Sequence, residues 1–168
     1  RIKGGDYMKA DFETIMAQEE VNFDDIKHLL DQRFEKYKGK SFIEKYALYM
    51  GMTQILELQL KQVLHHQFGY ISEDDIKKLE KKTFGQSVRI LKSKGVRSDI
   101  IVLLESNRDN RNNMAHSFLV DTMISTSLGF NMESIEVRQL DKSIYELEQL
   151  ALFWEWCVKH DALMPVDS

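Results

Sequence analysis

A run of nine polar residues, Glu105 to Asn113, carries side chains suited to chemistry on a phosphate ester. Arg111 offers a planar guanidinium whose donors match the geometry of phosphate oxygens. His116 follows five residues later, and an imidazole titrates near neutral pH, so it can take a proton from one oxygen and give one to another. A lone histidine is more often a surface or capping residue, so the interpretation of His116 depends on its neighbours.

Helical spacing brings further polar groups to this histidine. Each residue of an α-helix turns by about 100°, so Arg108, Asn112 and His116, each four residues apart, fall on one line. Arg111 sits one step beside Asn112. We therefore predict a stripe that holds two guanidinium groups, an amide and an imidazole.

The helix that carries this stripe can be followed on both sides of the polar run. Ser98 and Asp99 are expected to cap it, and the helical period set by Leu104 resumes after the run. The residues that resume it are Met114, Ala115, Phe118 and Leu119. We predict one helix from about Asp99 to Leu119 in which polar residues replace core residues, a break of local rules that is typical of functional sites.

The rest of the chain is typical of an all-α protein. It has 168 residues, 43% of them hydrophobic, with one proline and eight glycines, which fits one domain built from long helices. Apolar spacing and capping signals predict an up-and-down bundle of four to six helices. The expected helices cover about 23–37, 41–68, 72–82, 83–94, 99–119 and 140–158, and a loop or short hairpin is expected at 121–131.

We divide the chain into an N-terminal extension, 1–22, and a helical domain, 23–165. The extension is expected to contain a short helix, and the residues before Met8 could derive from an expression tag. Cys157 is the only cysteine, so no disulfide framework is expected and a reducing, cytoplasmic location is the default. No stretch approaches 18 consecutive apolar residues, which argues against a membrane span.

Charge is distributed unevenly along the sequence. The net charge is −4, but the segment 77–97 carries +7 and the remainder carries −11. A concentrated basic segment can supply phosphate contacts even in an acidic protein, although a solvated helix face explains the same charges equally well. The residues that would make such contacts are Lys77, Lys78, Lys81, Lys82 and Arg89.

The motif resembles a known family pattern. The stretch from Arg111 to His116 is similar to the Arg-x4-6-His signature of HEPN domains, including the polar residue that these domains favour directly after the arginine. The element Thr83-Phe84-Gly85-Gln86, which leads into a helix upstream, also looks like HEPN sequences. The resemblance covers roughly Ser41 to Leu119.

The resemblance implies a helical bundle that dimerises so that two motifs face each other across a cleft. It also implies metal-independent cleavage of RNA, in which the ribose 2′-OH attacks the phosphate and leaves a 2′,3′-cyclic phosphate and a 5′-OH. In this chemistry His116 would be the general acid or base, Arg111 would hold the phosphate, and Asn112 would orient the imidazole or a phosphate oxygen. Arg108 and Glu105 are expected to form supporting ion pairs or RNA contacts.

Such domains often act as toxins or anti-phage effectors, so RNA, a second copy of the chain, and an antitoxin or another regulatory protein are the expected partners. Neither DNA nor a membrane is expected as a partner. Some HEPN toxins carry a tyrosine two residues after the histidine as a site of nucleotide addition, but Phe118 stands there, which puts that form of control in doubt.

Two alternatives to an enzyme remain open. One is a catalytically inactive HEPN module that binds RNA, a nucleotide or a partner protein, and the other is an interaction domain whose polar stripe supports dimerisation. Neither a cofactor nor a metal is expected, because the five histidines do not pair with cysteines or carboxylates at ligand spacing. Tyr46 and Tyr49 could reach the motif, although their spacing also suits packing.

Overall fold

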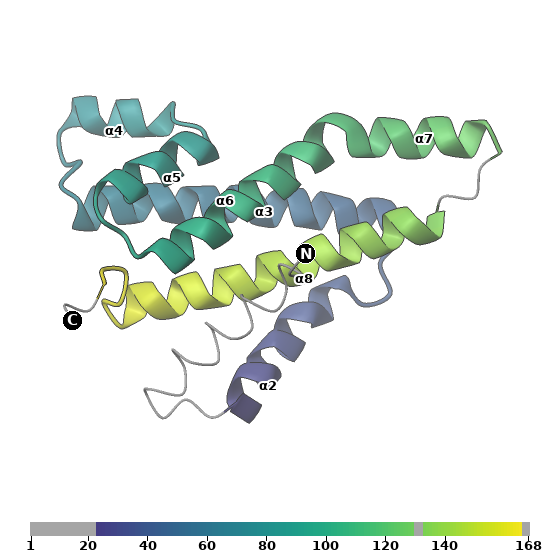
Figure 1. Ribbon diagram of the computed structural model, residues 1–168, viewed down its shortest axis with the longest axis horizontal. Coiled ribbons are helices and arrows are strands. Elements are labelled where there is room, and N and C mark those ends of the chain that lie inside the picture. Colours follow the sequence, from purple (N-terminus) through teal and green to yellow (C-terminus); the bar gives the residue numbers. More distant parts are fainter. Residues whose placement is uncertain (1–22, 130–132, 166–168) are drawn as a thin grey trace.

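The computed structural model describes residues 23–129 and 133–165, and every regular element within these ranges is helical (Figure 1). This confirms the all-α prediction, whereas the prediction for residues 1–22 lies outside the described residues. The elements are α2 (Phe23–Phe34), the 3₁₀ turn η1 (Glu35–Tyr37), α3 (Phe42–Gln67), α4 (Glu73–Glu80), α5 (Phe84–Ser93), α6 (Ser98–Asn113), the π-helix η2 (Met114–Phe118), α7 (Leu119–Ser127) and α8 (Glu133–Lys159). Since α6, η2 and α7 are continuous, the described helices form about six rods, at the upper end of the predicted number.

Helix starts follow the capping signals in the sequence. At the start of α3, the Ser41 hydroxyl accepts from the Glu44 amide at 3.4 Å, while the Glu44 carboxylate accepts from the Ser41 amide at 2.8 Å. Thr83 and Gln86 form the same reciprocal pair at the start of α5, with distances of 3.3 and 3.0 Å. These capping boxes satisfy amide groups that would otherwise have no partner in the first turn.

The predicted cap of α6 is wrong. Arg97, not Ser98 or Asp99, is the N-cap residue, and it makes no side-chain capping bond. The Asp99 carboxylate instead accepts from the Arg97 guanidinium at 2.7 and 2.8 Å and from the Ile100 amide at 2.7 Å. The Asp99 carboxylate is therefore held by Arg97 within the first turn, two residues after the N-cap, rather than at the N-cap position itself.

The loop or hairpin predicted at 121–131 is also wrong for residues 121–127, which belong to α7, whereas residues 128 and 129 form a turn and 130–131 lie outside the described residues. Thr122 and Thr126 fit into this helix by donating their hydroxyls to the carbonyl oxygens four residues earlier, at 2.7 and 2.8 Å. The helix ends before Gly129, which adopts a positive φ of 78°. Polar and β-branched residues are therefore poor indicators of a loop here.

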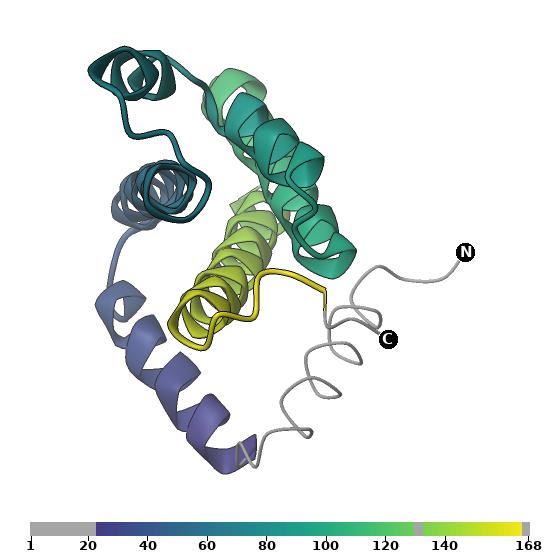
Figure 2. The same cartoon turned by 90° about the vertical axis from the view of Figure 1, so that its left-hand side faces the viewer.

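Three long rods form the centre of the bundle (Figures 1 and 2). The α6–α7 rod runs opposite to α3 and α8, α5 packs against both α3 and α6, and α4 lies at the end of the molecule far from α7. Buried leucines of α3 fill the space between the rods together with an apolar stripe of α8, which includes Leu147 and Trp154. None of the described helices is both long and apolar enough for a membrane span.

Helix α2 crosses α8 and packs mainly on that helix. Its apolar contact is small, with Ile26 and Leu30 against Leu152 and with Phe34 and Trp156 at the edge. Such a limited apolar surface contributes little to holding a helix in place, because hydrophobic stabilisation is roughly proportional to the area removed from water. Polar contacts must therefore help to dock α2.

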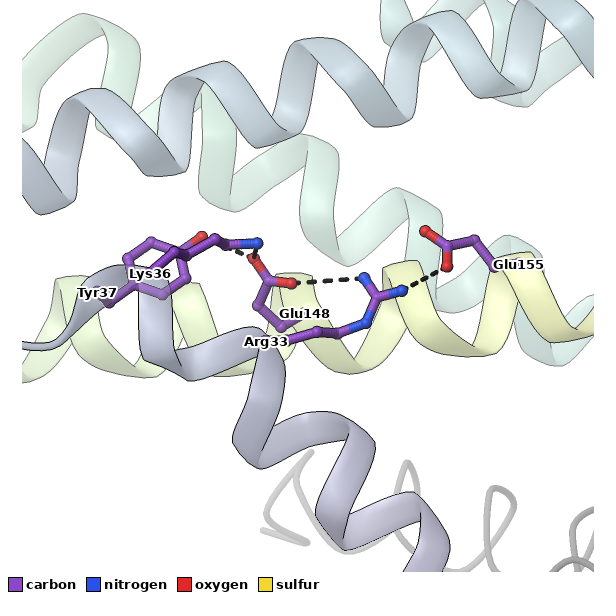
Figure 3. A network of polar contacts seen from close by, with 5 residues as sticks. All are labelled: Arg33, Lys36, Tyr37, Glu148 and Glu155. Atoms are coloured by element: carbon purple, nitrogen blue, oxygen red, sulfur yellow. Dashed lines mark hydrogen bonds and ion pairs between the residues drawn. The ribbon is translucent and has the colours of Figure 1, made fainter.

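A buried carboxylate on α8 provides these polar contacts (Figure 3). The Glu148 side chain is 0% exposed and accepts from the Tyr37 hydroxyl and the Lys36 ammonium group, both at 2.6 Å. Its second oxygen lies 3.6 Å from the Arg33 guanidinium, which also pairs with the exposed Glu155. Burial, followed by the hydrogen bond to Glu148, raises the pKa of Tyr37, so its phenol stays a donor to this carboxylate.

Candidate functional site

The predicted motif spans the junction of α6 with the π-helix η2. Arg111 lies in the last turn of α6 and His116 in the middle of η2. In a regular α-helix, residues five apart are separated by about 140° around the axis. A π-turn acts as one extra residue and sets the following side chains back by about 100°, so it brings His116 part of the way toward Arg111.

Arg111 occupies the face of α6 that is turned to the core. The buried residues of this face follow spacings of four, three and seven, with Arg111 at the missing position between the third and the fourth, and they are Ile100, Leu104, Asn107 and Met114. Arg111 itself is half-buried. The positions of Asn107 and Arg111 confirm that polar residues replace core residues in the middle of the helix. Arg111 therefore faces the core and not the side of the helix that carries the predicted stripe.

The line of Arg108, Asn112 and His116, with the supporting residue Glu105 one turn before Arg108, faces another way. Glu105 pairs with Lys92 of α5 at 3.1 Å, and a Cβ atom added to Gly85 would lie 3.0 Å from the Arg108 side chain, so the first turn of α5 covers α6 at this point. Because α5 begins at residue 84, the stripe beyond Arg108 is left open, and Asn112 and His116 are exposed.

The supporting residues Arg108 and Glu105 are already paired with other side chains, whereas Arg111 of the predicted catalytic pair has only one weak polar contact with a described residue. Arg108 is bound to Asp109 at 2.8 Å, and that contact raises the pKa of the guanidinium. Glu105 is engaged by α5. Arg111 donates to Asn112 at 3.5 Å, which is long for a hydrogen bond, so its guanidinium keeps donors for another acceptor.

Neighbouring helices hold the motif segment in place. The Tyr46 hydroxyl of α3 donates to the Met114 carbonyl oxygen at 2.9 Å, at the first residue of η2, and the Tyr46 ring stacks on Phe118. On the other side, the Asn110 amide donates to the Glu146 carboxylate of α8 at 2.8 Å. The π-helical segment is thus fixed from two sides, although its outer face is open.

Two buried polar side chains beside the motif lack partners in the described structure. One is Tyr49 of α3, whose hydroxyl has no partner among the described residues. The other is Asn107, whose amide nitrogen and oxygen both have none there. The sequence alone does not decide between packing and function for Tyr49, and Asn107 is not among the predicted site residues. The signal for Asn107 is its place on the apolar period of Ile100 and Leu104, where a buried amide is unusual.

The basic segment is less uniform than its sequence suggests. Lys77 and Lys78 lie on α4 near acids four residues earlier, Glu73 at 3.9 Å and Asp74 at 2.8 Å. No ion pair joins Lys81, Lys82 or Arg89 to a described residue. These three cations are therefore the better candidates for contacts with RNA phosphates.

If the segment binds RNA, the lysines within α4 and those that follow it should respond differently to substitution. Replacing Lys81 and Lys82 with alanine should weaken RNA binding and lower its salt slope by about 1.4, because each neutralised phosphate of single-stranded RNA contributes about 0.7. Replacing Lys77 and Lys78 should change the slope less, because those charges already have acidic neighbours. Fluorescence anisotropy over a salt series measures RNA affinity and its salt slope. If both double variants keep the salt slope of the unchanged chain, the charges are only solvated.

Within 23–129 and 133–165, no group of three or more histidine, cysteine, aspartate or glutamate side chains is placed to hold a metal ion. Comparison of the chain with protein-family models, curated proteins and solved structures found no match. The site is therefore interpreted from its own geometry and from the motif resemblance.

Proposed function

We propose that the protein is a metal-independent endoribonuclease of the HEPN type that acts as a toxin or anti-phage defence effector. The observation that carries the proposal is the π-helical turn at the motif, where His116 is exposed, five residues after the half-buried Arg111. π-helical turns occur frequently at functional sites, where they re-aim a side chain. The exposed Asn112 between the two provides a further amide for a phosphate oxygen.

The reaction needs two proton transfers. A new bond forms between the ribose 2′ oxygen and phosphorus while the bond from phosphorus to the 5′ oxygen breaks, which yields a 2′,3′-cyclic phosphate and a 5′-OH. One neutral imidazole takes the 2′-OH proton, and one imidazolium gives a proton to the leaving 5′ oxygen. Arg111 donates to the non-bridging oxygens as charge grows on them. Since each chain supplies one motif histidine, the proposed site combines the motifs of two copies.

An apolar face of α7 provides a surface for the second copy. Val120 and Ile124 of α7 and Leu128 at its C-cap are four residues apart and, like Met123, are each at least half exposed. They follow His116 directly along the same rod. Exposed apolar side chains gathered in this way are typical of an interaction surface. Packing of two α7 helices across these residues would bring two copies of His116 to one cleft.

This surface can be tested without touching the motif. The double substitution Met123→Glu and Ile124→Glu should convert a dimer into a monomer and reduce RNA cleavage, with little change in thermal stability, because both side chains are at least half exposed. The control is Ile71→Glu, which changes an equally exposed residue at the α4 end of the molecule. Light scattering after size exclusion measures the mass; an unchanged dimer in the double variant would contradict this interface.

The activity itself is tested with the purified chain, single-stranded or tRNA-like RNA, and EDTA. Cleavage with 2′,3′-cyclic phosphate ends supports the proposal. Growth arrest on expression that Arg111→Ala relieves would support an enzyme rather than a binding module. Tight RNA binding without cleavage would instead favour the inactive module. One observation favours that alternative: no hydrogen bond from a described residue orients the His116 imidazole.

A further inference from the structure

Tyr49 has a feature that packing does not explain. Its side chain is 0% exposed between α3 and the other long rods, and its hydroxyl has no hydrogen-bond partner in the described structure. A buried hydroxyl without a partner is unfavourable, and a phenylalanine would fill the same space without that cost. Tyr46, one turn earlier, shows the usual solution, because its hydroxyl donates to the Met114 carbonyl oxygen.

Two charged groups of the motif region act on the Tyr49 hydroxyl. Burial is the main reason that the pKa of Tyr49 is raised; the Glu146 carboxylate raises it further, and the Arg111 guanidinium lowers it. Helix register places Arg111 near this hydroxyl: the α6–α7 rod runs opposite to α3, and Tyr46 bonds to Met114, so Tyr49, three residues after Tyr46, lies level with Arg111, three residues before Met114. Glu146 comes from α8 and is held by Asn110, whereas Arg111 comes from the core-facing side of α6. An acceptor on α8 and a donor on α6 thus belong to the same part of the bundle as this hydroxyl.

The unpaired Asn107 amide lies one turn before Arg111 on the same face of α6. Its burial and that of the Tyr49 hydroxyl leave three polar atoms without partners on the core side of the motif. Buried polar groups of this kind are commonly joined by an ordered water. Arg111 also has donors to spare, since its bond to Asn112 is long. The core side of the guanidinium therefore has suitable partners within the fold.

We propose that Tyr49 is a positioning residue for Arg111. Because the hydroxyl has no direct partner in the described structure, one buried water links it to both groups: the water accepts from the guanidinium and donates to the Glu146 carboxylate, and the Tyr49 hydroxyl bonds to the same water. This holds the inner edge of the guanidinium in the core and leaves the outer edge free for the phosphate beside His116. The inference rests on the proposed ribonuclease function for its catalytic consequence, but the contact between Tyr49 and Arg111 can be tested without RNA.

The test compares Tyr49→Phe with the unchanged chain. Because the hydroxyl has no direct partner within the described fold, its removal should leave the melting temperature nearly unchanged, while loss of the support should speed exchange of the Arg111 Nε proton with water several-fold. That proton is followed by ¹⁵N NMR and assigned by its absence in Arg111→Lys. The kcat for RNA cleavage should fall about tenfold with KM nearly unchanged, since a displaced guanidinium affects the transition state more than binding.

The matched control is Tyr46→Phe, which removes a hydroxyl that does have a partner and should lower the melting temperature. Unchanged Arg111 exchange in Tyr49→Phe would overturn the inference. If the unchanged chain does not cleave RNA, the proposed function fails, and the exchange measurement alone still decides whether Tyr49 positions Arg111.

Discussion

Replacing His116 with alanine is expected to lower RNA cleavage by about 10²–10⁴, the usual effect of losing general acid–base catalysis. In the proposed dimer the substitution removes both the group that accepts the 2′-OH proton and the group that protonates the 5′ oxygen. The side chain is exposed and makes no hydrogen bond with a described residue, so the fold should keep its stability. The rate is measured in EDTA with saturating RNA, so that a change in binding does not hide a change in chemistry.

Two further variants separate the role of His116 from that of any exposed charge. His28→Ala removes an exposed histidine on α2, whose contact with Gln32 is local, and it should leave cleavage unchanged. Arg111→Lys keeps a positive charge but loses the planar fork, so it should reduce kcat less than alanine at the same position. Undiminished cleavage by His116→Ala would refute the assignment of the catalytic residue.

Mixing active and inactive subunits tests the composite site. A mixture of the unchanged chain with His116→Ala subunits contains heterodimers that have one intact histidine. If the two motifs form one cleft, these heterodimers lack one of the two proton-transfer groups, so activity should fall with the square of the fraction of unchanged chain. Two independent sites would instead give activity proportional to that fraction, because each unchanged subunit then keeps its own site.

The helices are predictable where a local signal specifies them. The pairs Ser41–Glu44 and Thr83–Gln86 form capping boxes because each bond joins residues three apart, which the sequence displays directly. Asp99 fails as a cap because Arg97 competes for its carboxylate, a contact that residue types alone do not reveal. The loop prediction for 121–127 fails because threonine hydroxyls can bond within the helix as well as break it.

The motif is predictable as residue types but not as geometry. Regular α-helical spacing predicts the line of Arg108, Asn112 and His116, but it cannot anticipate the π-turn, which begins at Met114, where the Tyr46 hydroxyl of α3 bonds to the rod. The core-facing position of Arg111 follows from the burial of Asn107 and Met114. A sequence shows that a polar residue interrupts an apolar period, but the packing around it decides whether it turns inward or outward.

The buried Glu148 should make the largest single contribution to docking α2. Glu148→Ala is expected to lower the free energy of unfolding by about 2–4 kcal/mol, because it leaves the Tyr37 hydroxyl and two cations without their shared acceptor. The loss should be smaller than for a wholly buried ion pair, since the Lys36 and Arg33 side chains are 33% and 21% exposed and can regain contact with water. Urea denaturation measures the difference.

Glu155→Gln is the matched control, because Glu155 pairs with the same Arg33 but has a side chain that is 43% exposed. An exposed pair contributes about 0–1 kcal/mol, so this variant should unfold at nearly the urea concentration of the unchanged chain. Glu148→Gln should fall between the two, because the amide oxygen can still accept from Tyr37 while the negative charge is lost. Equal effects of Glu148→Ala and Glu155→Gln would mean that the apolar contact of Ile26 and Leu30 with Leu152 holds α2 by itself. Faster amide hydrogen exchange confined to α2 in Glu148→Ala would show instead that the carboxylate acts on this helix rather than on the whole bundle.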